Sequence, residues 1–210
     1  MTVNAYEGEY PPATEVNKPL AIVQLHDLLI DSYDGNEDAL QTELTKFTCV
    51  RNPDVEAFLH RNALRFEKAH KSRTYLAVSE RSLMSESTEL EIFGYFTLSL
   101  KHLYLSTDIS KSKQKELHGL FLPQGNVVVG YLLGQLGKDD TYSDIPIGDR
   151  LLNAAMDVIQ STAQRAVGGR FMLIECSPHE KLLEFYRRNG YDILQVDPED
   201  RMAQLVHQLN

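Results

Sequence analysis

Residues 127–148 read VVVGYLLGQLGKDDTYSDIPIG, and this stretch decides the fold. It begins with an apolar run that ends at Gly137, which is typical of a buried strand. A short polar loop follows, and a helix is expected to begin near Gly148, because apolar residues then recur at helical spacing. A helix that begins directly after a strand presents free backbone N–H groups and the positive end of its dipole. The sequence therefore predicts an anion-binding site at this junction.

The elements that follow the junction continue the pattern. Gly168 and Gly169 are expected to end the helix. Residues 170–176 are apolar at both alternating positions, as in a parallel strand that is buried on both faces. Residues 179–189 predict a second helix, which Gly190 ends. Residues 191–196 and 202–209 then predict a hairpin at the C-terminus.

The elements before the junction are less regular. Residues 74–78 and 90–100 predict two strands, antiparallel because the link between them leaves no room for a crossover helix. Asn52-Pro53-Asp54 supplies the signals of a helix start, and apolar spacing extends that helix for about four turns to Phe66. Residues 47–50 predict a short strand, whereas residues 20–29 fit either a helix or a strand. Residues 1–19, with three prolines, predict a flexible or draped arm before a single domain at residues 20–210.

This order of elements, with Phe185-Tyr186 followed by Gly190-Tyr191, resembles the GNAT family of acetyl-coenzyme A-dependent N-acetyltransferases. The resemblance covers the chain from about Phe47 to the C-terminus. It implies an α/β fold in which helices flank a central mixed β-sheet that is splayed at its fourth and fifth strands. It also implies acetyl-CoA as the co-substrate and no metal.

The phosphate loop is the part of the chain that departs most from the family. The family signature Gln/Arg-x-x-Gly-x-Gly/Ala falls on residues 143–148, and Gly148 is the one glycine retained. Pro146 removes a backbone donor, and Asp144 adds a negative charge near the cofactor phosphates. The resemblance implies that the backbone amides of the loop bind the pyrophosphate and that the end of the fourth strand contacts pantetheine. A tight strand-to-helix connection without a ligand is the alternative. The cofactor contacts implied are Leu136, Gly137, Lys138, Ser143, Asp144, Ile145, Ile147, Gly148, Asp149 and His179.

Two side chains are the candidates for catalysis. Tyr186 matches the tyrosine that many family members use as a general acid toward the departing thiolate, and a phenol with a pKa near 10 can donate a proton at neutral pH. The alternative for Tyr186 is a core aromatic residue. Glu175, with Gln135 nearby, is the candidate proton acceptor beside the acceptor amine. An ion pair with a neighbouring Lys or Arg is the alternative for Glu175, and it is the one we favour.

Composition limits the partners and the compartment. The net charge of −9 argues against a general nucleic-acid partner, because phosphate neutralisation needs a surplus of Lys and Arg. No apolar run approaches the roughly 20 residues that span a bilayer, so no membrane contact is expected. The N-terminus shows no secretory signal, and two cysteines are too few for a disulfide scaffold. We therefore expect a cytoplasmic protein.

The expected function is transfer of an acetyl group from acetyl-CoA to a primary amine of a small-molecule or protein acceptor, by direct attack of the amine on the thioester. One alternative is a GNAT-fold toxin that acetylates aminoacyl-tRNA. We rank it below a small-molecule or protein acceptor because of the acidic composition and the altered loop. A second is a non-catalytic GNAT-fold binding module with a degenerate phosphate loop. Whether the protein forms a homodimer is left open.

Overall fold

The computed structural model describes residues 20–84, 89–119 and 125–209, so the arm expected over residues 1–19 lies outside the described residues. The strands are β1 (Leu20–Gln24), β2 (Arg73–Ser79), β3 (Ile92–Tyr104), β4 (Val127–Lys138), β5 (Phe171–Cys176), β6 (Asp192–Val196) and β7 (Ala203–Gln208). The helices before β4 are α1 (Leu25–Asp31), α2 (Glu37–Leu44), α3 (Pro53–Arg61), α4 (Ala63–Lys68), α5 (Glu80–Met84) and α6 (Lys111–His118). After β4 come a 3₁₀ turn η1 (Asp140–Tyr142), α7 (Gly148–Val158), a π-helix η2 (Ile159–Ala163), α8 (Gln164–Val167) and α9 (Glu180–Arg188).

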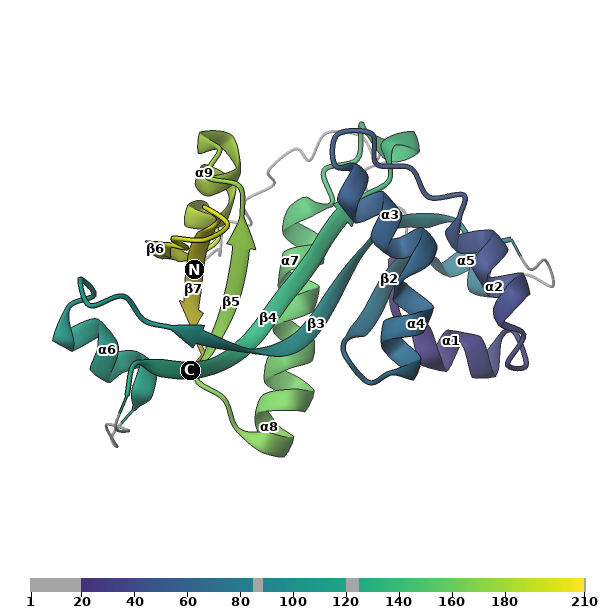
Figure 1. Ribbon diagram of the computed structural model, residues 1–210. Helices are drawn as coiled ribbons and strands as arrows, with labels where there is room; N and C mark the ends of the chain where they lie inside the picture. The colour runs from purple at the N-terminus through teal and green to yellow at the C-terminus, as the bar shows by residue number, and fades with distance from the viewer. Residues whose placement is uncertain (1–19, 85–88, 120–124, 210) are drawn as a thin grey trace, which may run out of the picture.

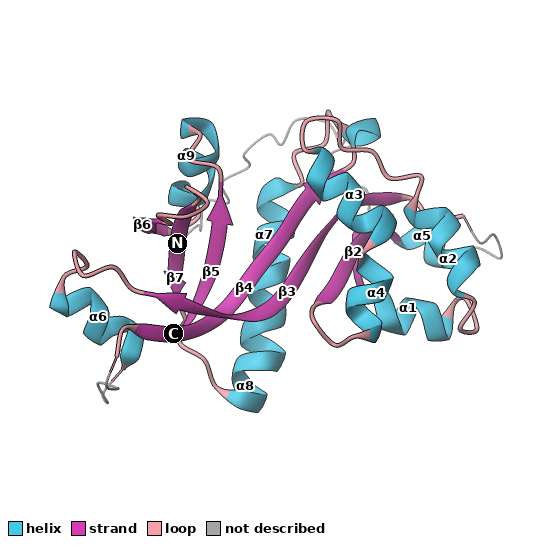
Figure 2. Ribbon diagram, in the orientation of Figure 1, coloured by secondary structure: helices cyan, strands magenta, loops and turns pink. Residues whose placement is uncertain are grey.

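The strands form one mixed sheet in the order β1-β2-β3-β4-β5-β7-β6. Neighbouring strands are antiparallel except β4 and β5, which run parallel (Figures 1 and 2). The expected antiparallel pair is β2 with β3, and the expected C-terminal hairpin is β6 with β7. The inner strand of that hairpin is β7, which pairs with β5 and leaves β6 at the edge.

Helices cover both faces of the sheet, and each layer has its own core. On one face α7 packs on β3 and β4, where Phe96, Leu133 and Leu151 are buried together. On the other face α1 and α3 pack on β2 and β3, around Leu76 and Tyr95. In Figure 1 α7 lies behind the sheet, and α3 and α4 lie in front of it. Each fully buried aliphatic or aromatic side chain contributes roughly 1.5–3 kcal/mol, so these two layers hold the sheet in place.

Three expectations about the N-terminal half need correction. The helix expected to run from Asn52 to Phe66 is two helices, α3 and α4, which meet at Asn62, where the backbone is distorted to φ −115°. Residues 47–50 form no strand, because the Thr48 and Val50 amides donate to carboxylates of a distant loop and the Cys49 amide donates to Glu56. Residues 20–29 contain both structures, β1 and then α1, where the Gln24 side chain accepts a hydrogen bond from the Asp27 amide.

The central strands separate at one end of the sheet. Only Tyr131–Leu133 of β4 pair with Met172–Ile174 of β5, although β4 continues to Lys138. Just beyond the last pair, Gly134 has no partner on β3, because the register passes from Leu133 to Gln135. This is a β-bulge, which bends and twists a strand. The bulge therefore coincides with the point at which β4 leaves β5.

Candidate active site

The end of β4 carries the first group of expected cofactor contacts. Leu136, Gly137 and Lys138 pair with β3 on one side, and β5 does not pair with them on the other. A Cβ at Gly137 would lie 2.4 Å from the Cγ1 atom of Val55 on α3, so only glycine permits this close contact. The hydroxyl of Tyr95 donates to the Val55 carbonyl at 2.6 Å. The strand end is therefore held rigidly from the α3 side and open along its β5 side.

Side chains, rather than glycines, fix the loop after β4. The buried carboxylate of Asp139 accepts hydrogen bonds from the Thr48 amide at 2.8 Å and the Thr141 amide at 2.7 Å. Asp140 accepts from the Val50 amide at 2.7 Å. The sequence reading missed both carboxylates, although two acidic residues directly after a strand are a visible signal. Together they hold residues 48–50 against the loop.

The ammonium group of Lys138 closes the same loop from the other side. It donates to the carbonyl of Ser143 at 2.7 Å and to that of Ile145 at 3.2 Å. Tyr142 packs edge-on against Phe93 with ring centroids 4.6 Å apart, and burial raises the pKa of its phenol to about 12. The loop is thus a defined structure before any ligand binds.

The amides that remain available for an anion are fewer than the sequence implied. The amides of Ser143, Ile145 and Ile147 bond to carbonyls of the loop itself. Those of Asp144, Gly148 and Asp149 make no backbone hydrogen bond within the described chain. Gly148 and Asp149 begin α7, so their N–H groups point out of the helix start, where the dipole favours negative charge.

A carboxylate next to this helix start is neutralised by α9. Arg188 donates to both oxygens of Asp149 at 2.9 Å, and Asn189 donates to one of them at 2.9 Å. The hydrogen bond from Asn189, and then the one from Arg188, lower the pKa of Asp149. The ring of Phe185 lies beneath the Arg188 guanidinium and against Gly148. Asp149 therefore adds little net negative charge to the anion site, and α7 and α9 are held together.

Tyr186 lies in the core of the α7 layer, only 5% exposed. Its ring contacts Phe185 and Tyr191, and no residue in the described ranges makes a hydrogen bond with its hydroxyl. Burial raises the pKa of this phenol above its ordinary value, so the proton is held more firmly. The residue is thus packed as a core aromatic, and its hydroxyl is also an uncommitted proton donor.

The other predicted side chains have different roles. Glu175 forms an ion pair with Lys101 and accepts a hydrogen bond from Gln204 at 2.9 Å, as in the alternative that the sequence favoured. His179 occupies the N-cap position of α9, and its side chain makes no capping hydrogen bond. Burial raises the pKa of Cys176 to about 11, so its thiol stays protonated.

The described residues contain no cluster of metal ligands and no helix long and apolar enough to cross a membrane.

Comparisons with known proteins give one class of match. No protein-family model and no curated protein matches the sequence. A crystal structure of AtaTR bound with acetyl-CoA has 25% identity and a TM-score of 0.64, covering 90% of this chain and 93% of that one. A crystal structure of a tyrosine-to-phenylalanine mutant of KacT has 24% identity and a TM-score of 0.64, covering 90% and 94%. These toxins are GNAT-fold acetyltransferases. The protein has the GNAT fold.

A third GNAT-fold structure bears on the expected partners. It is AtaT complexed with acetyl-methionyl-tRNAfMet, with 24% identity and a TM-score of 0.63, covering 88% of this chain and 93% of that one. The expectation of the GNAT fold, a mixed sheet splayed at β4 and β5, is confirmed. The expectation that nucleic acid is an unlikely partner, which rested on net charge, is not supported by this neighbour.

The loop analysis predicts which carboxylate holds the loop in place. Asp139→Ala removes the acceptor of two amides, and it should lower the free energy of unfolding by about 1–3 kcal/mol. Asp144→Ala is the matched control, because the Asp144 side chain is exposed and has no partner among the described residues; it should change stability by less than about 0.5 kcal/mol. Urea denaturation measures both. Equal effects would contradict the assignment of Asp139 as the anchor.

Proposed function

We propose that the protein is an acetyl-CoA-dependent N-acetyltransferase whose acceptor is the α-amino group of an aminoacyl-tRNA. The observation that carries the proposal is the end of the sheet, where the unpaired edge of β4 and the start of α7 come together. An unpaired strand edge offers hydrogen bonds to an extended amide-containing chain such as pantetheine. A helix start offers amides and a positive dipole to a pyrophosphate.

The chain's own residues suit both parts of the co-substrate. Leu136, Gly137 and Lys138 supply the strand edge, and the amides of Asp144, Gly148 and Asp149 supply the anion site. Lys138 keeps its charge close to the loop while it binds the carbonyls of Ser143 and Ile145. The carboxylate of Asp149 is held by Arg188, so it does not oppose the phosphates with a full charge.

Transfer of the acetyl group proceeds by attack of the amine on the thioester and then by cleavage of the carbon–sulfur bond, and these residues can assist both steps. The neutral amine attacks the thioester carbonyl, and negative charge develops on the carbonyl oxygen. Backbone N–H groups at the end of β4 stabilise that charge. The carbon–sulfur bond then breaks, and Tyr186 donates its proton to the departing thiolate. The phenolate then regains a proton from solvent.

The amine loses its own proton without a dedicated protein base. An α-amino group has an ordinary pKa of about 7.7–8.0, so a useful fraction is already neutral at physiological pH. Glu175 is committed to Lys101 and Gln204, which makes it a poor base. In the proposed reaction the second proton therefore leaves to water. Glu175 becomes a residue that positions Lys101 on the sheet face opposite α7.

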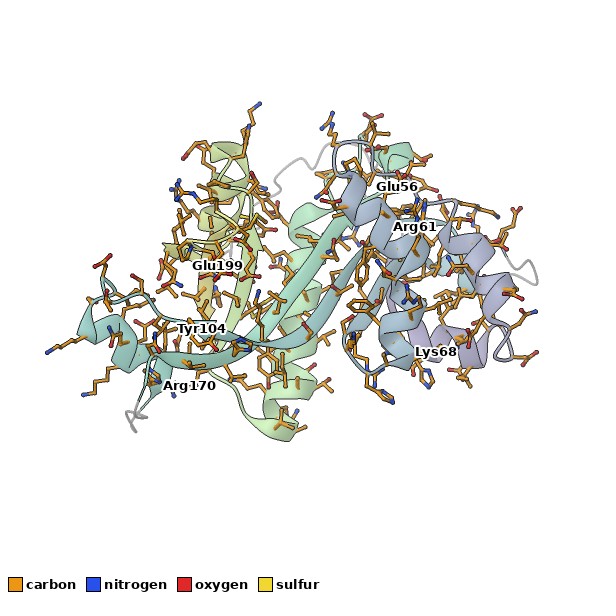
Figure 3. The ribbon with its side chains drawn as sticks, in the orientation of Figure 1. Glu56, Arg61, Lys68, Tyr104, Arg170 and Glu199 are labelled. Carbon is orange, nitrogen blue, oxygen red and sulfur yellow. The ribbon has the colours of Figure 1, made fainter. Side chains whose placement is uncertain are left out.

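The choice of aminoacyl-tRNA over a small molecule rests on the AtaT complex and on a local concentration of positive charge. A concavity of 570 Å³ beside α4 is lined by Arg61, Arg65, Lys68 and Lys71, together with Glu37 and Asp38. Lys68 pairs with Glu37, whereas Arg61 and Arg65 form no ion pair with a described carboxylate. Arg61 and Lys68 lie on the layer in front of the sheet (Figure 3). We assign the phosphate backbone of the tRNA to this surface. We also place the reaction in the cytoplasm.

Binding of the co-substrate is the first test. Acetyl-CoA should raise the melting temperature and release or absorb heat in calorimetry, because it binds the native state. Acetyl-pantetheine, which lacks the pyrophosphate, should bind at least about tenfold more weakly if the α7 amides hold the phosphates. The full-length protein is used. Absence of any heat or thermal shift at millimolar acetyl-CoA would favour the non-catalytic binding module instead.

The acceptor is the second test. Radiolabelled acetyl-CoA should label methionyl-tRNA, whereas uncharged tRNA and free methionine should remain unlabelled. Replacing Arg61 and Arg65 together by alanine should lower kcat/KM and flatten its dependence on salt concentration, because two phosphate contacts are lost. Arg187→Ala is the control, since Arg187 pairs with Glu180 on α9. Labelling of a protein or a polyamine in preference to charged tRNA would contradict the acceptor and leave the enzyme class intact.

The third test concerns Tyr186 as the general acid. Tyr186→Phe should lower kcat by about 10²–10⁴-fold with little change in acetyl-CoA affinity. Tyr191→Phe is the matched control, because Tyr191 lies in the same cluster but donates to the sulfur of Met172 at 3.0 Å. Because burial raises the pKa of Tyr186, the acid stays protonated, and wild-type kcat should not decline on the alkaline side below about pH 10. Unchanged kcat in a folded Tyr186→Phe variant would make Tyr186 a core residue only.

A further inference from the structure

A second cavity lies on the face of the sheet that α7 covers, at the far end of that helix from the anion site. Its volume is 450 Å³, within the range of small-molecule sites. Buried Leu98 and Tyr131 from the sheet form one wall, and Ile159 and Ala163 from the π-helix form the other. Ile159 is 11 residues beyond Gly148, which is about 16 Å along a helix. The cavity is thus separate from the proposed acetyl-transfer site.

The π-helix is the first sign of a ligand. An α-helix that continued from α7 would satisfy its backbone equally well, but residues 159–163 widen to a π-helix, with Gln164 donating to the Ile159 carbonyl. Such widened turns are rare and occur frequently at functional sites. Here the widened turn supplies Ile159, Thr162 and Ala163 to the cavity wall.

The polar groups on the cavity rim are the second sign. Ser72 lines the cavity, and its hydroxyl is shielded from solvent and has no hydrogen-bond partner among the described residues. The cations of the rim differ in their commitments. Arg73 is paired with buried Glu67 at 2.7 Å, whereas Lys71 forms no ion pair with a carboxylate in the described ranges and only lies 5.4 Å from the centre of the Phe66 ring. The two residues that carry these uncommitted polar groups, Lys71 and Ser72, therefore line an apolar chamber.

We propose that this cavity binds a small amphipathic anion, a carboxylate with an apolar tail, with the tail between Leu98 and the π-helix and the carboxylate at Lys71 and Ser72. The apolar rim extends the chamber outward, because Leu100 and Val167 are 66% and 75% exposed. A ligand tail would cover such exposed aliphatic groups and remove them from water. The site shares Lys71 with the proposed tRNA surface, but it does not depend on the acetyltransferase proposal.

A series of alkyl carboxylates tests the apolar part. Titration calorimetry of the full-length protein with hexanoate, octanoate and decanoate should show affinity rising about fourfold for each added CH₂ until the cavity is filled. Ala163→Phe fills the chamber from the π-helix, and it should weaken decanoate at least tenfold. Thermal melting and near-ultraviolet circular dichroism establish that the variant is folded. Absence of binding across the series at millimolar concentration overturns the proposal.

The role of the Lys71 charge at the cavity rim is tested by comparing decanoate with 1-decanol, a neutral ligand that has the same tail. Decanoate should bind more tightly than 1-decanol, and Lys71→Gln should remove most of that difference, about three- to fivefold, while 1-decanol affinity stays constant. Lys115→Gln, at an exposed lysine of α6, is the matched control and should change neither affinity. Equal losses in both lysine variants would overturn the assignment of Lys71.

Two further outcomes separate the ligand site from its rivals. If Ala163→Phe does not fold, Val167→Glu serves instead, because this exposed position places a like charge beside the carboxylate and should weaken decanoate but not 1-decanol. Sedimentation analysis addresses a second copy of the chain as the occupant. A dimer that Ala163→Phe dissociates, together with no response to decanoate, would overturn the ligand site in favour of self-association.

Discussion

The separation of β4 from β5 is the constraint on which the site depends. Two parallel strands in the middle of a sheet normally satisfy each other's backbone groups along their length, yet here pairing stops after Leu133 and Ile174. A β-bulge at Gly134 coincides with this point, and a bulge bends and twists the strand that carries it. Gly137 then allows the strand to press against Val55. An unpaired edge inside a protein needs a partner, and an extended ligand can supply it.

The anion site proposed after β4 lacks most of the glycines of the family signature. A glycine-rich loop gains its shape from conformational freedom, and its backbone must be ordered by the ligand. Here Asp139, Asp140 and Lys138 hold the backbone through side chains, and Pro146 fixes one dihedral angle. Fewer amides remain free as a result. Those that remain, at Asp144, Gly148 and Asp149, are held in place in advance, which would lower the entropy lost when the proposed anion binds.

Local patterns predicted the elements well, and non-local contacts account for what they missed. Apolar periodicity placed β4, α7, β5 and α9 within a few residues, because each buries one side along its own length. The run at 47–50 has strand-like composition, but carboxylates about 90 residues later accept hydrogen bonds from two of its amides. Glu175 could not be assigned either, since its partner Lys101 lies 74 residues away.

Net charge is a weak guide to partners for a related reason. A charge of −9 is a sum over the chain, whereas a ligand responds to charges within a Debye length, about 8 Å at physiological salt. Several acids here are neutralised in place, as Glu67 is by Arg73 and Asp149 is by Arg188. Cations without such partners, Arg61 and Arg65, then stand together beside α4. An acidic protein can in this way keep a basic surface for phosphates, because pairing determines which charges a ligand meets.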